Sequence, residues 1–404
     1  MTVDKLKNLT LLITDGKHGD CENADNSGFY FVSCKDIHDG IINYTDARQI
    51  TEQDFVETHR RTQLQPNDIL VTNSGTIGRM ALVKDVPETI RTTFQKSVAI
   101  VKPDTSKIIP AYLYYCLLNR VTDFVNNSNG SAQKNLLLGT MRDFTIQYYE
   151  QKTKQETVVS IIKPFDDLIE TNQRQIKLLE EAAQRLYKEW FVDLRFPGHE
   201  NVPVVDGVPE GWKNTTMATV CQAVGGGTPS TARKEYYENG TIPWVTPTDL
   251  TKMGSWILLD TEKKITTEGL ANSATKMLPP YTILMTSRAS IGYIAICEKE
   301  VCTNQGFISC IPYIDNIRYY LMFNLLNRVE EIKSKATGST FLEIAKRTFR
   351  ELQIIEPSES VLILFNTMIS SLLDKMRILR KQIEALDTTR NSLLPKLMSG
   401  EIAV

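Results

Sequence analysis

Two long stretches of the chain carry apolar residues at alternating spacings of three and four, and they constrain the fold more than any other feature. They span residues 155–190 and 362–397, and matching positions lie 207 residues apart. Such spacing predicts helices with a narrow apolar seam, as in a coiled coil. The seam residues are Ile162, Phe165, Ile169, Asn172, Ile176, Leu179 and Leu186 in the first stretch, and Ile369, Leu372, Met376, Leu379, Ile383, Leu386, Arg390 and Leu393 in the second.

Each seam is too narrow to stabilise a lone helix in water, so the two helices are predicted to pack on each other. Antiparallel packing is favoured, because the segment between the helices then begins and ends at the same end of the pair. Asn172 and Arg390 are the polar members of the seams. We interpret both as residues that fix the register at some cost in stability.

The rest of the sequence is duplicated. Residues 64–83 (LQPNDILVTNSGTIGRMALV) match residues 278–297 (LPPYTILMTSRASIGYIAIC), and residues 112–121 match residues 320–329. The sequence predicts an α+β fold: two duplicated strand-rich domains separated by an antiparallel coiled coil of two long helices, with pseudo-two-fold symmetry. The predicted parts are residues 1–150 (first domain), 151–195 (central helix), 196–211 (a linker rich in Pro and Gly), 212–355 (second domain) and 356–404 (distal helix).

Local patterns predict the elements of each domain. Leu6 to Ile13 has the spacing of a short helix, and a capping box at Thr153 to Glu156 is predicted to start the central helix. Pro164 predicts a kink or a later start of that helix. Further predictions are strands at residues 28–33, 68–72, 80–83, 97–101, 144–146 and 242–246, and a helix at residues 110–124.

Composition excludes several classes of protein. The chain of 404 residues has no apolar run near the ~20 residues that span a bilayer, and its start lacks the apolar core of a signal peptide, so a cytoplasmic protein is expected. Its seven cysteines form no pattern typical of disulfides or zinc sites. The net charge of −2 argues against a chain that holds nucleic acid without help.

Motifs for catalysis are incomplete. Asp249 with Glu262-Lys263-Lys264 resembles the spacing of metal-dependent nucleases, but the duplicate lacks the lysine. Leu278-Pro-Pro-Tyr281 has leucine where amino-methyltransferases have an asparagine, and Gly225-Gly226-Gly227 is not followed by G-K-[ST]. No histidine recurs in the duplicate. We therefore predict neither catalytic residues nor a metal site.

Polar loops recur at equivalent places in both domains while their residues differ. Residues 33–36 match 246–249, residues 72–74 match 286–288, and residues 93–95 match 303–305. Arg, Asn, Gln, Ser and Thr can contact base edges, although such residues also occupy ordinary loops. The predicted DNA-binding residues are Lys17, Ser33, Lys35, Asn73, Ser74, Gln95 and Lys96 in the first domain, and Gly227, Thr228, Ser230, Arg233, Thr246, Thr248, Ser287, Arg288, Asn304 and Gln305 in the second.

Four motifs together resemble one family. They are V-P-E-G-W at residues 208–212, I-P-W-V-x-x-x-D-L at residues 242–250, L-P-x-x-x-I-L-x-T followed by I-G near residues 278–292, and L-L-P-K-L-M-S-G-E-I at residues 393–402. With the repeated domain and helix, they make the whole chain similar to the specificity (S) subunit of type I restriction-modification enzymes.

The resemblance implies a non-catalytic subunit with two target-recognition domains, which reads a bipartite, asymmetric site on double-stranded DNA. It also implies partners: two modification (methyltransferase) subunits and restriction (motor-nuclease) subunits. No cofactor is then expected in this subunit, while S-adenosylmethionine, ATP and Mg are expected on the partners. Two alternatives stay open from the residues: a stand-alone Mg-dependent nuclease, and a coiled-coil scaffold with two protein-binding modules.

Overall fold

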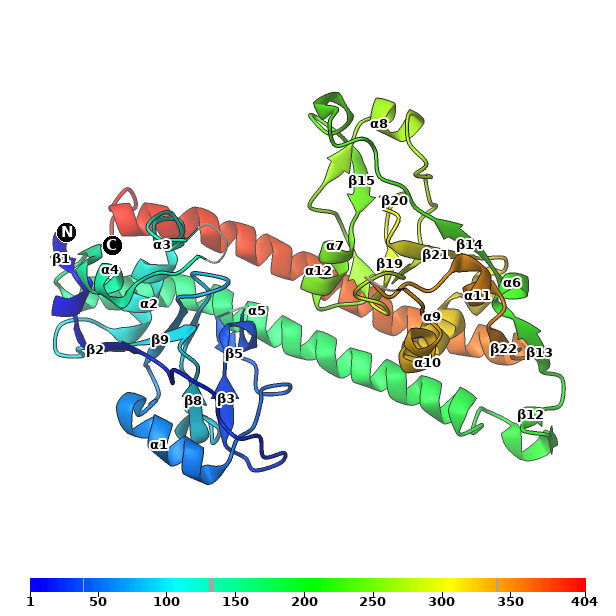
Figure 1. Cartoon of the computed structure of the whole chain (residues 1–404), viewed down its shortest axis with the longest axis horizontal. Coiled ribbons are helices and arrows are strands. Elements are labelled where there is room, and N and C mark those ends of the chain that lie inside the picture. The colour runs from blue at the N-terminus through cyan, green and yellow to red at the C-terminus, as the bar shows by residue number, and fades with distance from the viewer. Residues whose placement is uncertain (39, 131–133, 339–340) are drawn as a thin grey trace. The chain divides into compact units, whose positions relative to one another are not determined.

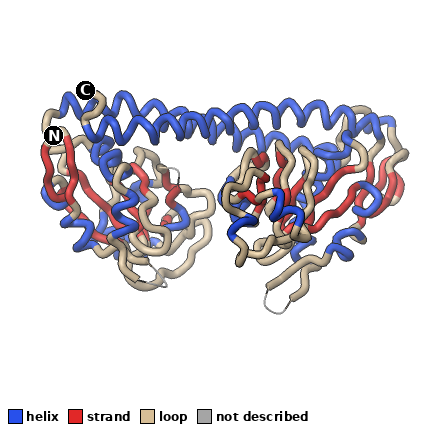
Figure 2. The backbone as a smooth tube through the Cα atoms, turned by 90° about the horizontal axis from the view of Figure 1, so that it is seen from above, coloured by secondary structure: helices blue, strands red, loops and turns tan. Residues whose placement is uncertain are grey.

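The computed structural model describes residues 1–38, 40–130, 134–338 and 341–404 (Figure 1). They form two compact units. Unit 1 comprises Met1–Glu170 with Ile383–Val404, and unit 2 comprises Thr171–Gln382. Both units combine strands and helices, as Figure 2 shows by colour, so the prediction of a mixed helix and sheet fold is confirmed.

Two long helices are present where the seams predict them. Helix α5 is Lys152–Tyr187, followed by a π-helical turn at Lys188–Val192, and helix α12 is Glu359–Ser399. The predicted capping box and the later start are wrong, because α5 begins before Thr153 and continues through Pro164. A buried side chain anchors its first turn instead: Gln155 accepts a hydrogen bond from Ile109 N (2.8 Å) and donates one to Tyr149 O (2.7 Å).

Segments of the two helices pack antiparallel within each unit. In unit 1, Arg390 Nη1 of α12 lies 2.6 Å from Asp166 Oδ1 of α5, and Tyr149, just before α5, donates to Leu397 O. In unit 2, Asn172 Nδ2 donates to Gln382 Oε1 (3.3 Å), and the rings of Trp190 and Phe365 lie 5.8 Å apart. In each unit the residue number rises along α5 as it falls along α12.

Burial along the seams follows the prediction with small shifts. At two places the neighbouring residue, Leu373 or Leu394, is the buried one, because a straight helix drifts against a seven-residue repeat. The buried seam residues are Ile162, Ile169, Asn172, Ile176, Ile369, Met376, Leu379 and Ile383; the half-buried ones are Phe165, Leu179, Leu186, Leu372, Leu386, Arg390 and Leu393.

The two units repeat one sheet order, which bears out the duplication. In unit 1 the antiparallel order is β2-β9-β6-β7, and in unit 2 it is β14-β21-β18-β19, with β16 added at the edge. The bounds are β2 Thr10–Asp15, β9 Val98–Pro103, β6 Ile69–Thr72 and β7 Met80–Leu82 in unit 1, and β14 Cys221–Gly225, β21 Phe307–Pro312, β18 Ile283–Thr286, β19 Ile294–Cys297 and β16 Ile257–Leu258 in unit 2.

A short parallel pair accompanies each sheet. It is β3 (Tyr30–Val32) with β8 (Thr92–Phe94) in unit 1, and β15 (Ile242–Val245) with β20 (Cys302–Thr303) in unit 2; β15 also pairs with β17 (Lys264–Ile265). The remaining strands pair two by two: β1 (Thr2–Lys5) with β10 (Thr145–Tyr148), β4 (Ile37–His38) with β5 (Ile41–Ile42), β11 (Val204–Val205) with β12 (Val208–Pro209), and β13 (Lys213–Thr216) with β22 (Gln353–Glu356).

The helix predicted at Leu6 to Ile13 is wrong. A 3-10 turn at Leu6–Asn8 leads into β2, because Thr10–Asp15 completes the sheet beside β9.

The predicted helix at residues 110–124 is present as α2 and α3. The shorter helices are α1 Glu52–Thr62, α2 Pro110–Leu118, α3 Val121–Asn126, α4 Leu138–Asp143, α6 Met217–Val220, α7 Pro247–Met253, α8 Thr267–Ala271, α9 Arg318–Asn327, α10 Val329–Ser334 and α11 Lys346–Arg350. Within the described ranges, every helix is too short or too polar to cross a membrane.

A carboxyl group lies in the interior of unit 2, where α5 meets the turn before β16. Burial raises the pKa of Glu180 to about 7, against smaller lowering effects of the Trp256 backbone hydrogen bond and of Arg380. The stability that this raised pKa contributes is present below about pH 4.5 and is lost as the pH rises through about 7.

Glu180→Gln is therefore expected to raise the stability of unit 2 at pH 8 by about 1–3 kcal/mol and to change it little at pH 4.5. Urea unfolding at both pH values measures the difference. Glu181→Gln, one residue further along α5 and exposed, is the control. An equal effect of Glu180→Gln at both pH values would contradict the assignment.

Candidate nucleic-acid interface

Four segments meet at one end of the strands in unit 1, and together they carry the predicted DNA-binding residues. Backbone hydrogen bonds connect them: Gln95 N donates to Val32 O (2.9 Å), Lys17 N to Phe94 O (2.9 Å) and Asn73 N to Ser97 O (3.0 Å). The segments follow β2, β3, β6 and β8, and we call them the recognition loops of unit 1. The structure therefore brings together residues that lie up to 79 positions apart, from Lys17 to Lys96.

Unit 2 builds the same arrangement after β14, β15, β18 and β20, the recognition loops of unit 2. Asn304 N donates to Val245 O (3.0 Å), Gly227 N to Thr303 O (2.9 Å) and Ser287 N to Gly306 O (2.8 Å). These bonds make Asn304 the counterpart of Gln95, and Gln305 the counterpart of Lys96. The sequence match of residues 93–95 with 303–305 is therefore wrong by one position.

Two of the predicted contact residues cap short helices. The Asp36 carboxylate accepts hydrogen bonds from Ser33 N and Ser33 Oγ (both 2.8 Å). Asp249 accepts the same two bonds from Thr246 N and Oγ1 (both 2.7 Å). Because these hydroxyl groups donate within the protein, we assign Ser33 and Thr246 to positioning the loops.

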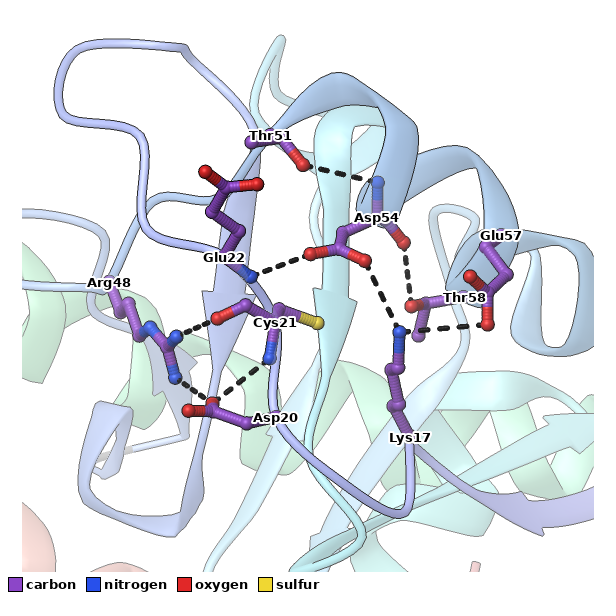
Figure 3. A network of polar contacts seen from close by, with 9 residues as sticks. All are labelled: Lys17, Asp20, Cys21, Glu22, Arg48, Thr51, Asp54, Glu57 and Thr58. Atoms are coloured by element: carbon purple, nitrogen blue, oxygen red, sulfur yellow. Dashed lines mark hydrogen bonds and ion pairs between the residues drawn. The ribbon is translucent and has the colours of Figure 1, made fainter.

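Lys17 is held by carboxylates rather than left free (Figure 3). Its Nζ lies 3.3 Å from Asp54 Oδ1 and 3.6 Å from Glu57 Oε1. Asp54 also accepts a 2.6 Å hydrogen bond from Glu22 N, and this bond, followed by Lys17, lowers the pKa of Asp54 below its usual value. Lys17 thus attaches the loop after β2 to α1, and its charge is balanced.

Arg48 binds the later part of the loop after β2. Its Nη1 lies 2.5 Å from Asp20 Oδ1, and it also donates to Cys21 O and to Asn23 (Figure 3 draws the first two). The guanidinium lies over the Phe31 ring, 5.5 Å from its centroid. Beside it is a polar hollow lined by Asn23, Asp25, Asn26, Lys35, Asp46, Ala47, Arg48 and Gln49.

Exposure separates the predicted residues into groups. The side chains of Lys35, Lys96, Thr228, Ser230, Arg233, Thr248, Arg288 and Gln305 are exposed; Lys17, Ser33, Ser74, Gln95, Thr246 and Asn304 are half-buried; Asn73, Gly227 and Ser287 are buried. Gly227 uses its N–H on Thr303, so it has a packing role rather than a phosphate contact. Thr228 donates to Gln305, and Arg288 Nε lies 3.8 Å from Glu343 Oε2.

One exposed position beside the recognition loops of each unit is absent from the predicted set. Arg79 N donates to Thr72 Oγ1, and Tyr293 N donates to Thr286 Oγ1, both at 2.9 Å. Both side chains are exposed. They are counterparts in the matched blocks 64–83 and 278–297, where a change from Arg to Tyr could have revealed them.

The carboxylates of the possible nuclease motif are already engaged. Asp249 holds Thr246 and accepts a hydrogen bond from Glu262 N (2.9 Å), and Glu262 pairs with Lys252 (3.1 Å). In the part of the chain that the structure describes, His, Cys, Asp and Glu side chains form no group of three suited to a metal. The geometry thus gives no support to the hypothesis of a metal-dependent nuclease.

The chain is similar to the specificity subunits of known type I restriction enzymes. The type I restriction enzyme MjaIX specificity subunit of Methanocaldococcus jannaschii is 36% identical over 183 residues, which are 45% of this chain and 42% of that protein. The HindI specificity subunit of Haemophilus influenzae is 24% identical over 371 residues, covering 75% of this chain and 80% of that subunit. The match to the first relative thus spans less than half of its length.

The fold is also similar to a solved structure. The crystal structure of the type I restriction-modification S subunit from M. genitalium superposes with a TM-score of 0.56 at 16% identity, covering 98% of this chain and 95% of that one. The model of the type I restriction modification DNA specificity domain matches residues 17–181 and again residues 209–386. This protein therefore belongs to the type I restriction modification DNA specificity family and carries two DNA specificity domains.

Proposed function

We propose that the chain recognises a bipartite, asymmetric site on double-stranded DNA, with the recognition loops of each unit contacting one half. The observation that carries the proposal is a shared frame with different side chains. The exposed or half-buried counterparts in units 1 and 2 are Lys35 and Thr248, Ser74 and Arg288, Arg79 and Tyr293, and Lys96 and Gln305. Side chains of different chemistry on one frame favour different bases at the two halves.

The two long helices fit this role as a spacer. We propose that α5 and α12 form an antiparallel coiled coil related by a pseudo-two-fold axis. Antiparallel packing within each unit and the constant offset of 207 between the seams support it. Such a spacer would fix the distance between two recognition domains.

We further propose that the chain acts without catalysis of its own and docks modification and restriction subunits. S-adenosylmethionine, ATP and Mg would then belong to those partners. The net charge of −2 supports a need for partners, since a chain that grips phosphates alone is normally basic.

Arg288→Ala is the test of the proposed function. In the complex with modification subunits, it should weaken recognition of one half-site by about 1–3 kcal/mol, as expected for the loss of an arginine that pairs with a guanine. Arg288 is suited to such a contact because its pairing with Glu343 is long and exposed. Selection of bound sequences from random DNA, before and after the substitution, measures the change.

Arg185→Ala, at an exposed position of α5, removes the same charge and is the matched control. It should leave both half-sites unchanged. Equal weakening of both half-sites by Arg288→Ala, or a lower melting temperature with unchanged specificity, would show that Arg288 is structural.

A further inference from the structure

An ion pair joins each sheet to a long helix, and its polarity is reversed between the two units. In unit 1, Lys84 follows β7 and pairs with Glu170 of α5. In unit 2, Glu298 follows β19 and pairs with Arg377 of α12, with Lys381 Nζ 3.2 Å from its second oxygen. The cation therefore lies on the sheet in unit 1 and on the helix in unit 2.

The two sheet residues occupy the same place in the fold. Leu82 pairs with Ile69 in unit 1, as Ile296 pairs with Ile283 in unit 2. One residue further, the carbonyl oxygens of Val83 and Cys297 each accept a 2.8 Å hydrogen bond from the turn before the neighbouring strand. Lys84 and Glu298 are the next residues and are thus counterparts.

The two helix residues are counterparts as well. Glu170 and Arg377 lie 207 positions apart, which is the offset between the two seams. Both members of the pair have therefore changed sign together. A single change of sign would have placed like charges in contact, so the reversal preserves attraction within each unit.

The environments of the pairs differ in exposure. The side chains of Glu298 and Arg377 are 12% and 22% exposed, against 46% and 43% for Lys84 and Glu170. Arg377 also pairs with Asp374 and lies over the Tyr281 ring, 5.8 Å from its centroid. Water screens the pair in unit 1 more, so the unit 2 pair should carry the larger effect.

We propose that this reversed charge pair is a docking code that matches each specificity domain to its own helix. The apolar spacing itself does not distinguish the two helices, because both seams follow the same one. Docking of the first domain on the other helix would oppose Lys84 to Arg377, and docking of the second would oppose Glu298 to Glu170. The code thus rejects the wrong helix, in the same chain or in a second copy, by like-charge contact.

The test uses the full chain and reverses the more buried pair. Glu298→Lys should increase amide exchange of β19 and of the facing turns of α12 about tenfold or more, because three cations then meet at one site. Adding Arg377→Glu and Lys381→Glu restores opposite charges and should bring exchange back to within about threefold of the parent. Glu300→Lys, exposed two residues further on, is the control for the charge change.

Exchanging the two domains in one chain extends the test. Residues 1–150 and 212–355 change places in two versions of the chain. The first version keeps Lys84 and Glu298, and the second carries Lys84→Glu and Glu298→Lys. The second version should show the slower exchange at the sheet and helix contact. The proposal is refuted if Glu298→Lys increases amide exchange no more than Glu300→Lys does. It is also refuted if Arg377→Glu with Lys381→Glu fails to bring the exchange back down. Both results are independent of whether the chains with exchanged domains fold.

Discussion

Gly226→Ala is expected to destabilise unit 2 by about 2–4 kcal/mol and to leave unit 1 unchanged. A Cβ atom at Gly226 would lie 2.1 Å from Asn304 O and 2.3 Å from Thr303 O, at the end of β20 and the start of the recognition loop that follows it. Backbone cannot swing aside as a flexible side chain can, so the loop after β14 must separate from β20. Specificity at the half-site of unit 2 should be lost with it.

Gly16→Ala makes the same change in unit 1, where the added Cβ would lie 1.8 Å from Phe94 O. Hydrogen exchange resolved along the chain measures each unit separately. Gly139→Ala in α4 is the control, since nothing lies within 4 Å of its Cβ position and alanine favours a helix. Loss of stability in the unit that was not altered would contradict this assignment.

Arg390→Ala is expected to lower the stability of unit 1 by about 2–3 kcal/mol, somewhat less than for a fully buried pair. Arg390 lies 2.6 Å from Asp166 Oδ1 and 2.7 Å from Asp387 Oδ1, and its side chain is 19% exposed. Without it, Asp166 loses this ion pair, while Tyr115 Oη still donates a 2.7 Å hydrogen bond to its second oxygen. Urea unfolding followed by exchange in unit 1 measures the loss.

The chain itself offers an apolar version of this contact. Asp166 moved by 207 positions is Leu373, and Arg390 moved back by 207 is Ala183; both are buried in unit 2. Asp166→Leu combined with Arg390→Ala should therefore recover most of the stability that Arg390→Ala loses. Arg347→Ala, whose side chain is 91% exposed, is the control. No recovery in the double variant would show that the ion pair has a role beyond packing.

The heptad spacing of the two seams and the internal repeat made the helices and the duplicated sheet predictable from the sequence. A seam of two residues per heptad indicated both helices, and the matched blocks 64–83 and 278–297 indicated one sheet built twice. Leu6 to Ile13 was mistaken for a helix because its apolar spacing suits a turn and a strand equally well. Pairing with β9, some 90 residues away, makes Thr10–Asp15 a strand, and the local sequence does not show this long-range pairing.

The repeat indicated where the polar loops of both units lie, but it did not give the partners of their side chains. Ser33 and Thr246 look like contact residues until the carboxylates three positions later are seen to accept their hydroxyl hydrogens. The ammonium group of Lys17 is paired with the carboxylate of Asp54, which lies 37 positions away in the sequence. The pairing of Lys17 with Asp54 depends on the folded arrangement, whereas the three-residue spacing of the two caps and the change from Arg79 to Tyr293 were readable from the sequence.

The division of the helices between units has a consequence for synthesis of the chain on the ribosome. The interior of unit 1 includes Leu394, Leu397 and Met398, and Cys116 Sγ lies 3.9 Å from Met398 Sδ. Residues 171–382 emerge before those late residues do, so unit 2 can close first although its sequence comes second. Until Ile383–Val404 is translated, the interior of unit 1 lacks the apolar side chains that α12 contributes, so the nascent first domain is expected to expose apolar surface for longer than unit 2 does.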